Sequence, residues 1–386
     1  MAGTKFAEPP SVNFIRGKRC AQRQAVPGVA LAVQLQIDVQ VLCTHCASCH
    51  SVKARLIVGG TMRIVSLLSS ATEIVCALGL EEQLVGISHE CDYPEAVLDR
   101  PVASRSCFDP AGLTSEEIDR AVRKAMAETG SVYTVDAEVL RELEPDLVLT
   151  QAVCDVCAVP AETAASAIQG MDSPARLLSL DAGDIEGIFK TVLEVAQACG
   201  IEERGRETVD ALRRRLSDVD RRVAQAVRRP RVLALEWLDP PFTAGHWVPE
   251  MIERAGGILA VGSAGERSRE ARPEELAASD PEVLLAIPCG YSLDEAEADV
   301  RSHESLLSQV GRRAVEAGDV WIGSGEYFSR SGPRIVDGIE ALTAAIHPEV
   351  FDTARESGIS RDTGILRAGA NSAVRRYSPS KTAAEA

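Results

Sequence analysis

The chain has 386 residues, of which 45% are hydrophobic, and it carries a formal net charge of −16. Such an acidic chain is repelled by nucleic acids and by anionic lipid surfaces, so we expect neither as its main partner. It contains no apolar run of about 18 residues, which argues against membrane insertion. The length is sufficient for two domains that each bury a hydrophobic core.

The first 61 residues differ in composition from the rest, with seven Lys and Arg against two Asp and Glu. Polar residues interrupt the apolar stretch 26–42, which therefore lacks the continuous core of a secretory signal. The motif Cys46-Ala-Ser-Cys49-His50 has the spacing of a c-type haem attachment site, and together with Cys43 and His45 it could instead hold zinc. Our main expectation is that residues 1–61 are a disordered or misassigned leader.

From residue 62 onwards, short apolar segments alternate with helix-type patterns. Strands are predicted at 62–68, 84–88, 132–135, 145–151 and 176–180, and helices at 73–80, 114–128, 137–144 and 161–169. Thr114 and Glu117 have the spacing of a capping box at a helix start. Strand–helix alternation predicts an α/β fold with a mostly parallel sheet covered on both faces.

A long helix is predicted over 203–227. Its apolar residues recur at spacings of three and four, namely Val209, Leu212, Leu216, Val219, Val223 and Val227. Gly200 ends a preceding helix over 184–199, and Pro230 ends this one. At 1.5 Å per residue the helix is about 37 Å long. We interpret 184–229 as bridging helices between two lobes; the alternative is one helix among many in a single domain.

The order of elements repeats after the long helix. PRVLALE corresponds to MRIVSLL, VPEMIERAGG to ATEIVCALGL, and PEELAASDPEVLLAIPCG to AEVLRELEPDLVLTQAVC. The distance from Glu73 to Pro145 is 72 residues, whereas that from Glu250 to Pro281 is 31. Two similar lobes are therefore predicted, and the first contains an insertion of about 40 residues. Parallel lobes of this kind bind ligands at the carboxyl ends of their strands.

Four motifs in this order carry a family resemblance over about 62–347: SHECDYP, EPDLVLTQ, WLDPPFTAGHWVPEMIERAGGILAVG and GEYFSRSGPRI. They resemble the periplasmic cobalamin-binding proteins of ABC uptake systems, which belong to the helical-backbone class of substrate-binding proteins. The resemblance implies the type III periplasmic-binding-protein fold, with two Rossmann-like lobes joined by one long helix. The predicted divisions are an N-terminal lobe at 62–183, bridging helices at 184–229, a C-terminal lobe at 230–347 and a disordered tail at 348–386.

The resemblance also implies non-catalytic binding of cobalamin or a related corrinoid between rigid lobes, with an ABC permease as partner. We expect a monomer, no catalytic residues and no resident metal. Other members of the class bind siderophores, haem or other metal chelates, so such a chelate is the first alternative. The second alternative is a redox or metal protein that uses Cys154-x-x-Cys157.

A corrin is a large flat ring fringed with amides, and it requires aromatic or prolyl faces together with a few polar groups. Aromatic residues make up only 4% of the chain, yet all three tryptophans, Trp237, Trp247 and Trp321, follow the long helix. Tyr291 also follows a predicted strand. Pro241 and Phe242 are interpreted as a wall, because two successive prolines cannot continue a central strand. Trp321 and Phe328 are equally compatible with core positions.

The expected ligand-binding set combines these faces with polar groups on strand-end loops: His89, Cys91, Asp92, Tyr93, Gln151, Cys154, Trp237, Pro241, Phe242, His246, Tyr327, Phe328 and Arg330. Arg330 and Arg334 are candidates for clamping amide or phosphate groups, although Arg334 is equally suited to cap a helix. A thiolate or imidazole from the loops is a candidate contact to cobalt, with buried structural cysteines as the alternative.

One departure from the family concerns location. The family is exported, whereas this chain shows no convincing signal, and its eleven cysteines favour a reducing compartment. We therefore expect a cytoplasmic protein, with a periplasmic or cell-surface location as the alternative.

Overall fold

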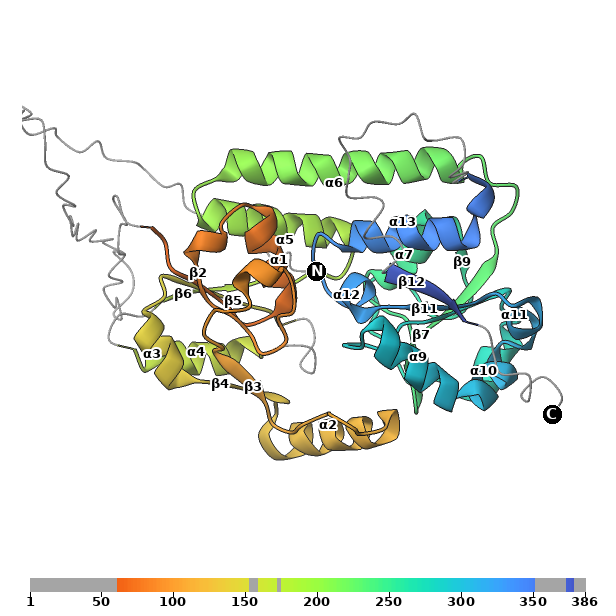
Figure 1. Ribbon diagram of the computed structural model, residues 1–386, viewed down its shortest axis with the longest axis horizontal. Helices are drawn as coiled ribbons and strands as arrows, with labels where there is room; N and C mark the ends of the chain where they lie inside the picture. The colour runs from red at the N-terminus through yellow and green to blue at the C-terminus, as the bar shows by residue number, and fades with distance from the viewer. Residues whose placement is uncertain (1–60, 153–158, 172–174, 351–372, 378–386) are drawn as a thin grey trace, which may run out of the picture. The chain divides into compact units, whose positions relative to one another are not determined.

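The computed structural model describes residues 61–152, 159–171, 175–350 and 373–377, all within one compact unit, Thr61–Ala386 (Figure 1). The prediction for the leader therefore lies outside the described residues, apart from Thr61. Within the described ranges, no helix combines the length and the apolar character that a membrane crossing requires.

The N-terminal lobe contains a four-stranded parallel sheet in the order β2-β1-β5-β6. Its elements are β1 (Ile64–Ser66), α1 (Ser69–Ala77), η1 (Glu81–Gln83), β2 (Leu84–Gly86), η2 (Glu95–Val97), α3 (Ala137–Leu143), β5 (Leu147–Thr150), α4 (Ala161–Gln169) and β6 (Arg176–Ser179). The strands at the centre of the sheet, β1 and β5, are completely buried, as expected for parallel strands that helices cover on both faces.

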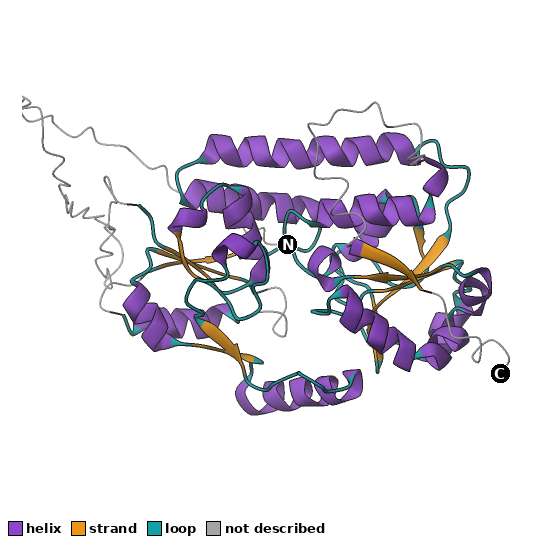
Figure 2. Cartoon of the chain, viewed as in Figure 1, coloured by secondary structure: helices purple, strands orange, loops and turns teal. Residues whose placement is uncertain are grey.

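The C-terminal lobe repeats this arrangement. Its elements are β7 (Arg231–Leu238), β8 (Pro241–Thr243), α7 (Val248–Arg254), β9 (Ile258–Leu259), α8 (Pro273–Ala278), β10 (Val283–Ala286), α9 (Leu293–Ser302), α10 (Glu304–Val310), α11 (Arg312–Ala317), β11 (Val320–Gly323), α12 (Gly325–Phe328), α13 (Ile335–Ile346), η3 (Pro348–Val350) and β12 (Val374–Tyr377). The parallel strands of this lobe lie in the order β9-β7-β10-β11. Each strand corresponds to the one at the same place in the order β2-β1-β5-β6 of the N-terminal lobe. The predicted α/β duplication with mostly parallel sheets is therefore confirmed (Figure 2).

The insertion in the first lobe forms a projecting unit. It contains the antiparallel strands β3 (Ser104–Ser106) and β4 (Tyr133–Val135), with helix α2 (Ser115–Thr129) between them. The capping box is present, because the Thr114 hydroxyl accepts from the backbone N–H of Glu117 and the Glu117 carboxylate accepts from that of Thr114. Gly130 ends the helix in the left-handed conformation at φ 72°, which favours glycine.

The prediction of a disordered tail over 348–386 is wrong at its described residues. Residues 374–377 form β12, an antiparallel edge strand on β11. Ala373 and Tyr377 are buried: Ala373 belongs to a hydrophobic cluster that contains residues of both lobes, and Tyr377 belongs to a cluster of the C-terminal lobe. The short alternation Val-Arg-Arg-Tyr in a polar context was too weak a pattern to predict a strand.

Two helices connect the lobes: α5 (Ile185–Ala198) and α6 (Glu202–Val223), which packs along α5 and along α13. Figure 1 shows α6 running above both lobes. The predicted stripe is buried at Val209, Leu212, Leu216 and Val219, and Val223 is half-buried. The helix ends there, four residues earlier than predicted, and Val227 is 94% exposed.

Polar contacts attach α6 to both lobes. The Arg204 guanidinium donates to the carbonyl oxygen of Leu78 at the end of α1 (3.0 Å). The Arg215 guanidinium contacts Asp337 and Glu340 on α13, with a distance of 2.9 Å from its Nε to Glu340 Oε1. Helices α1, α5, α6, α7 and α13 contribute to one continuous hydrophobic cluster, which contains residues of both lobes. The lobes therefore share a core layer as well as a covalent connection.

This shared layer predicts that α6 stabilises both lobes together. Leu216 is 3% exposed, so Leu216→Ala should lower the free energy of unfolding by about 2–5 kcal/mol. The control Val227→Ala should change it by less than about 0.5 kcal/mol. Urea unfolding followed by tryptophan fluorescence reports the C-terminal lobe alone, whereas far-UV circular dichroism reports both. Separate transitions for the two signals in Leu216→Ala would contradict a shared layer.

Candidate functional site

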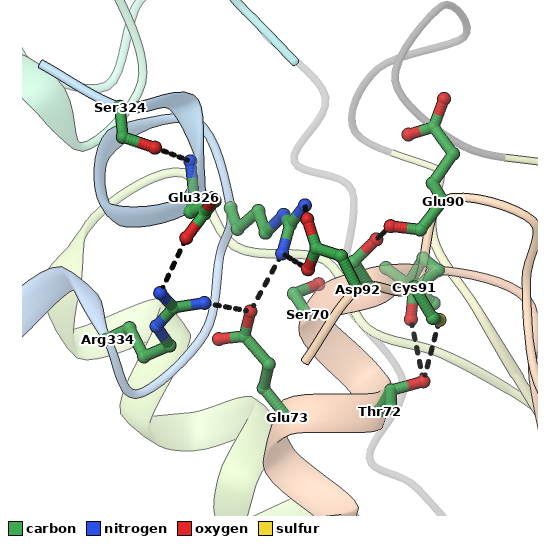
Figure 3. Close-up of polar contacts among 12 residues, drawn as sticks. Ser70, Thr72, Glu73, Glu90, Cys91, Asp92, Ser324, Glu326 and Arg334 are labelled. Carbon is green, nitrogen blue, oxygen red and sulfur yellow. Dashed lines mark hydrogen bonds and ion pairs between the residues drawn. The ribbon is translucent and has the colours of Figure 1, made fainter. Parts of the chain in front are cut away.

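A buried carboxylate links the two lobes. Glu73 lies on α1, and its side chain is almost completely enclosed. Its Oε1 accepts from Nη1 of Arg330 (3.2 Å) and from Nη1 of Arg334 (3.3 Å), both of which belong to the C-terminal lobe (Figure 3). A Cβ at Gly332 would lie 3.2 Å from Glu73 Oε2, so the loop that carries the two arginines passes very close to α1.

Further charges complete this junction cluster, which we define as Glu73, Asp92, Glu326, Arg330 and Arg334. Arg330 forms a bidentate ion pair with Asp92 of the N-terminal lobe. Its Nη1 is 2.6 Å from Oδ1, and its Nη2 is 2.7 Å from Oδ2. Arg334 donates to Glu326 at 2.8 Å. Bidentate guanidinium–carboxylate pairs are among the stronger and more directional polar contacts in proteins.

Two tyrosines from different lobes lie against the Arg334 guanidinium. Its central carbon is 4.4 Å from the ring centre of Tyr93 and 4.1 Å from that of Tyr327. A guanidinium at this distance over an aromatic face is attracted by the ring quadrupole. Arg334 occupies the N-cap position of α13 without a side-chain capping hydrogen bond, and its planar group is enclosed by Glu73, Glu326 and the two rings.

Burial dominates the electrostatics of Glu73. It raises the pKa of this carboxyl group to about 7, although Arg334 and Arg330 act in the opposite direction. Among the described residues, Glu73 Oε2 is one of the few buried side-chain atoms without a hydrogen-bond partner. Breaking a buried charge pair is costly, because the remaining charge stays desolvated.

The loop after β2 positions His89. Its Nδ1 is 2.9 Å from the hydroxyl of Ser104, and that hydroxyl donates to Ser88 Oγ (3.1 Å). The other ring nitrogen, Nε2, lies 3.8 Å from Glu90 Oε1, which is beyond hydrogen-bond distance. This Nε2 is buried and unpartnered within the described residues, and burial lowers the pKa of His89.

Glu90, the residue after His89, interacts with groups of both lobes. The Tyr133 hydroxyl donates to Glu90 Oε1 (2.9 Å), and the Tyr133 ring lies 5.2 Å from that of His89. Glu90 also interacts electrostatically with Cys289 of the C-terminal lobe, whose thiol neighbours Glu236 and Arg330. Cys91 is 3.1 Å from the Thr72 hydroxyl, and burial raises the pKa of its thiol.

The aromatic residues from the end of β7 onwards occupy either partly exposed wall positions or buried core positions. Trp237, Pro241, Phe242 and Tyr291 are partly exposed, and the rings of Trp237 and Tyr291 are 5.4 Å apart. Phe242 lies on β8, which is the edge strand next to β7. An edge position tolerates Pro241, as expected from the Pro-Pro pair.

Other predicted contacts are structural. Phe328 is fully buried, Tyr327 is buried beneath Arg334, and the Trp247 indole N–H donates to the carbonyl oxygen of Phe328 (2.7 Å). Phe328 therefore occupies the core alternative, and Arg330 is held by protein carboxylates. Trp321 is half-buried on β11 with Arg376 over its ring.

The remaining predicted residues are distributed over both lobes. Gln151 is buried at the end of β5 and bridges to Pro160. His246 adopts φ 52° in the loop before α7, and its Nε2 is buried and unpartnered among the described residues. Burial raises the pKa of the nearby Glu236 to about 7, against the effect of its hydrogen bonds to Ser268 and Gly245. Cys154 and Cys157 lie outside the described residues.

The structure thus brings together Asp92, Tyr93, Tyr327 and Arg330 from the predicted set. Sequence reasoning missed Glu73 and Glu326 as their partners. A charged residue on a helix that begins Ser-Ser-Ala-Thr resembles an ordinary solvated position. The signal available was the apolar run around it, which made burial the more consistent interpretation.

A cavity of about 730 Å³ lies away from the junction cluster, between α6 and α7. It is an open groove lined mainly by charged side chains such as Asp220, Arg229 and Glu253, which does not suit an apolar ring. Across the described residues, no group of three or more His, Cys, Asp or Glu side chains is arranged to hold a metal ion.

The fold therefore consists of two duplicated α/β lobes joined by a long helix. Residues 64–325 match the family model described as periplasmic binding protein, and the chain belongs to this family. It is therefore a substrate-binding protein of the ABC-transporter type, with the type III fold that the resemblance implied.

Relatives with different ligands are similarly close. The chain is 23% identical over 296 residues to an uncharacterized ABC transporter substrate-binding lipoprotein, YvrC, of Bacillus subtilis, covering 75% of this chain and 81% of that protein. It is 23% identical over 283 residues to a vitamin B12-binding protein of Vibrio cholerae, covering 72% and 87%. The periplasmic heme-binding protein RhuT of Roseiflexus sp. RS-1 aligns with a TM-score of 0.55 and 25% identity, covering 75% of this chain and 100% of that one.

The junction cluster generates a pH prediction. A carboxyl group whose pKa is raised on folding, here from 4.5 to about 7, contributes stability that is present below pH 4.5 and lost as the pH rises through 7. Between pH 5 and 8 the wild type should lose about 2–3 kcal/mol of unfolding free energy relative to Glu73→Gln. Urea unfolding at both pH values measures this difference. The exposed Glu82→Gln is the control, and parallel pH profiles for Glu73→Gln and the wild type would show that Glu73 stays ionised.

Proposed function

We propose that this protein binds a corrinoid where the two lobes face each other, without catalysing a reaction on it. Family membership supports a small-molecule ligand and a permease partner, and the vitamin B12-binding relative supports a corrinoid. The heme-binding relative makes haem the competing ligand. The distribution of exposed charge at the junction supports the corrinoid.

The exposed charges at the junction are negative. The side chains of Glu90 and Asp92 are 43% and 49% exposed, whereas those of Arg330 and Arg334 are 17% and 12% exposed. Both arginines are already paired with carboxylates. A ligand that enters here meets hydrogen-bond acceptors, while the nearby cations are enclosed.

This pattern favours amide donors over carboxylates. A corrin is fringed with amides, which donate N–H groups to carboxylates such as those of Glu90 and Asp92. Haem carries two ionised propionates, and like charges placed close together in a partly desolvated site are unfavourable. The partly exposed Trp237, Phe242 and Tyr291 supply faces for the ring.

Titration calorimetry with cyanocobalamin and with haemin tests the proposal on the full chain. We expect one corrinoid per chain and at least about tenfold weaker binding of haemin, a difference of about 1.4 kcal/mol. Tight binding of haemin together with no heat from any corrinoid would replace the corrinoid by haem. No binding of either would refute a tetrapyrrole-type ligand.

A pair of aromatic substitutions locates the ring. Phe242→Ala removes a partly exposed face and should weaken corrinoid binding by about 1–3 kcal/mol, or roughly 5- to 150-fold in Kd. Trp321→Ala is the matched control, because Trp321 lies on β11 against Arg376 and apart from the junction cluster. Calorimetry on both variants provides the comparison. Equal Kd values for Phe242→Ala and the wild type would place the ring elsewhere.

A further inference from the structure

The insertion in the first lobe reaches the second lobe. We call residues 107–131, which lie between β3 and β4 and include α2, the α2 arm. Its base is a two-stranded ribbon in which each strand has three residues, and an isolated ribbon of this size is only marginally stable. Val122 and Met126 pack on the hydrophobic cluster of the N-terminal lobe, so the arm belongs to that lobe.

The tip of the arm docks on the C-terminal lobe through one serine. The Ser115 hydroxyl donates to Asp299 Oδ1, and the Ser115 carbonyl oxygen accepts from Trp237 Nε1 (3.3 Å). The Tyr291 hydroxyl also bonds to the Ser115 side chain. Ser115 is consequently buried at the first position of a helix whose surface is otherwise mostly exposed. The positive end of the helix dipole faces Asp299, which favours the contact.

A second contact between the arm and the C-terminal lobe is weak. Arg123 pairs with Glu270 at 3.1 Å, and both side chains are largely exposed. Exposed ion pairs of this kind contribute little to stability. Elements with few buried apolar contacts open at low free-energy cost. The docked arm therefore depends mainly on the polar contacts of Ser115.

The arm docks at the partly exposed aromatic residues of the C-terminal lobe. Trp237 and Tyr291, which offer faces to a ring, are the residues that Ser115 contacts. Figure 1 shows α2 and α6 at opposite edges of the two lobes, so the lobes are connected on both sides when the arm is docked. Ser115 occupies the polar edges of both rings, namely the indole N–H and the phenol hydroxyl, so a ligand that bonds to either group has to displace the tip of the arm.

We propose that the α2 arm is a reversible clasp, which closes the lobe junction by docking Ser115 on Trp237, Tyr291 and Asp299 and releases to admit a ligand. Only the identity of that ligand rests on the proposed function. The clasp itself is a property of the chain and can be tested without a ligand.

Ser115→Asp is the decisive variant. It places a carboxylate against Asp299, and like charges at this distance oppose docking. A helix tolerates Asp in its first turn, where the dipole favours a negative charge, so α2 itself should stay folded. Ser166→Asp adds the same charge to an exposed position on α4 and serves as the control. Combining Ser115→Asp with Asp299→Asn removes the repulsion and should restore docking.

Two readouts follow the clasp in the free protein. Hydrogen exchange of residues 107–131 should accelerate in Ser115→Asp but not in Ser166→Asp. Cys289 is exposed near the junction, so a maleimide that carries a bulky polymer should modify its thiol at least about tenfold faster in Ser115→Asp than in Ser166→Asp. Desolvation by neighbouring groups raises the pKa of this thiol to about 12, so both variants are compared at the same pH. Unchanged exchange would show that Ser115 does not hold the arm. Faster exchange with an unchanged rate at Cys289 would show that the arm does not close the junction.

Ligand kinetics then test admission separately. Stopped-flow association of cyanocobalamin, or of haemin if that is the ligand, should be faster in Ser115→Asp and return to the wild-type rate in the double variant. Equal association rates in all variants would overturn the role in admission. If neither probe binds, the proposed function fails, while the exchange and thiol measurements still decide whether the clasp exists.

Discussion

A single apolar layer shared by both lobes constrains the rest of this structure. Helices α1 and α5 come from one side of the duplication and α7 and α13 from the other, and α6 packs along this layer. Hinge bending between the lobes would expose part of that layer, and each Å² of apolar surface so exposed costs roughly 25 cal/mol. The absence of proline or a glycine pair from α6 removes the usual site for a kink.

The junction cluster determines how the two lobes are aligned on this shared layer. An apolar layer holds surfaces together without fixing their register, whereas the bidentate pair of Arg330 with Asp92 requires one particular alignment of the lobes. Glu73 accepts from two arginines through one oxygen. The other oxygen, Oε2, is buried without a hydrogen-bond partner, and burial raises the pKa of the carboxyl group. Both features show that this contact carries a cost in desolvation. Packing thus supplies the stability, and the buried charges specify the geometry.

The elements that sequence predicted well are those with strong local patterns. The buried runs at β5 and β10 and the capping box of α2 were identified from few residues, and the duplication followed from matching the two halves. The long-range partners were not available in this way. Nothing local to Arg330 indicates that Asp92, 238 residues away, occupies the position expected for a ligand group. The aromatic residues illustrate the same limit, since Tyr327 and Phe328 are neighbours of Arg330 in sequence but face the interior.

The duplication accounts for the two lobes but not for the insertion in the first lobe. The second half has no counterpart of the α2 arm, yet the arm's serine contacts the tryptophan near the end of β7 of that half. Two lobes that are held by a common layer cannot readily separate to admit a wide ring. A small element attached to one lobe by a short ribbon can move without disturbing that layer, because few of its side chains are buried. Rigid lobes and a weakly attached arm are therefore complementary features: the first preserves the shape of the junction, and the second allows a ligand to reach it.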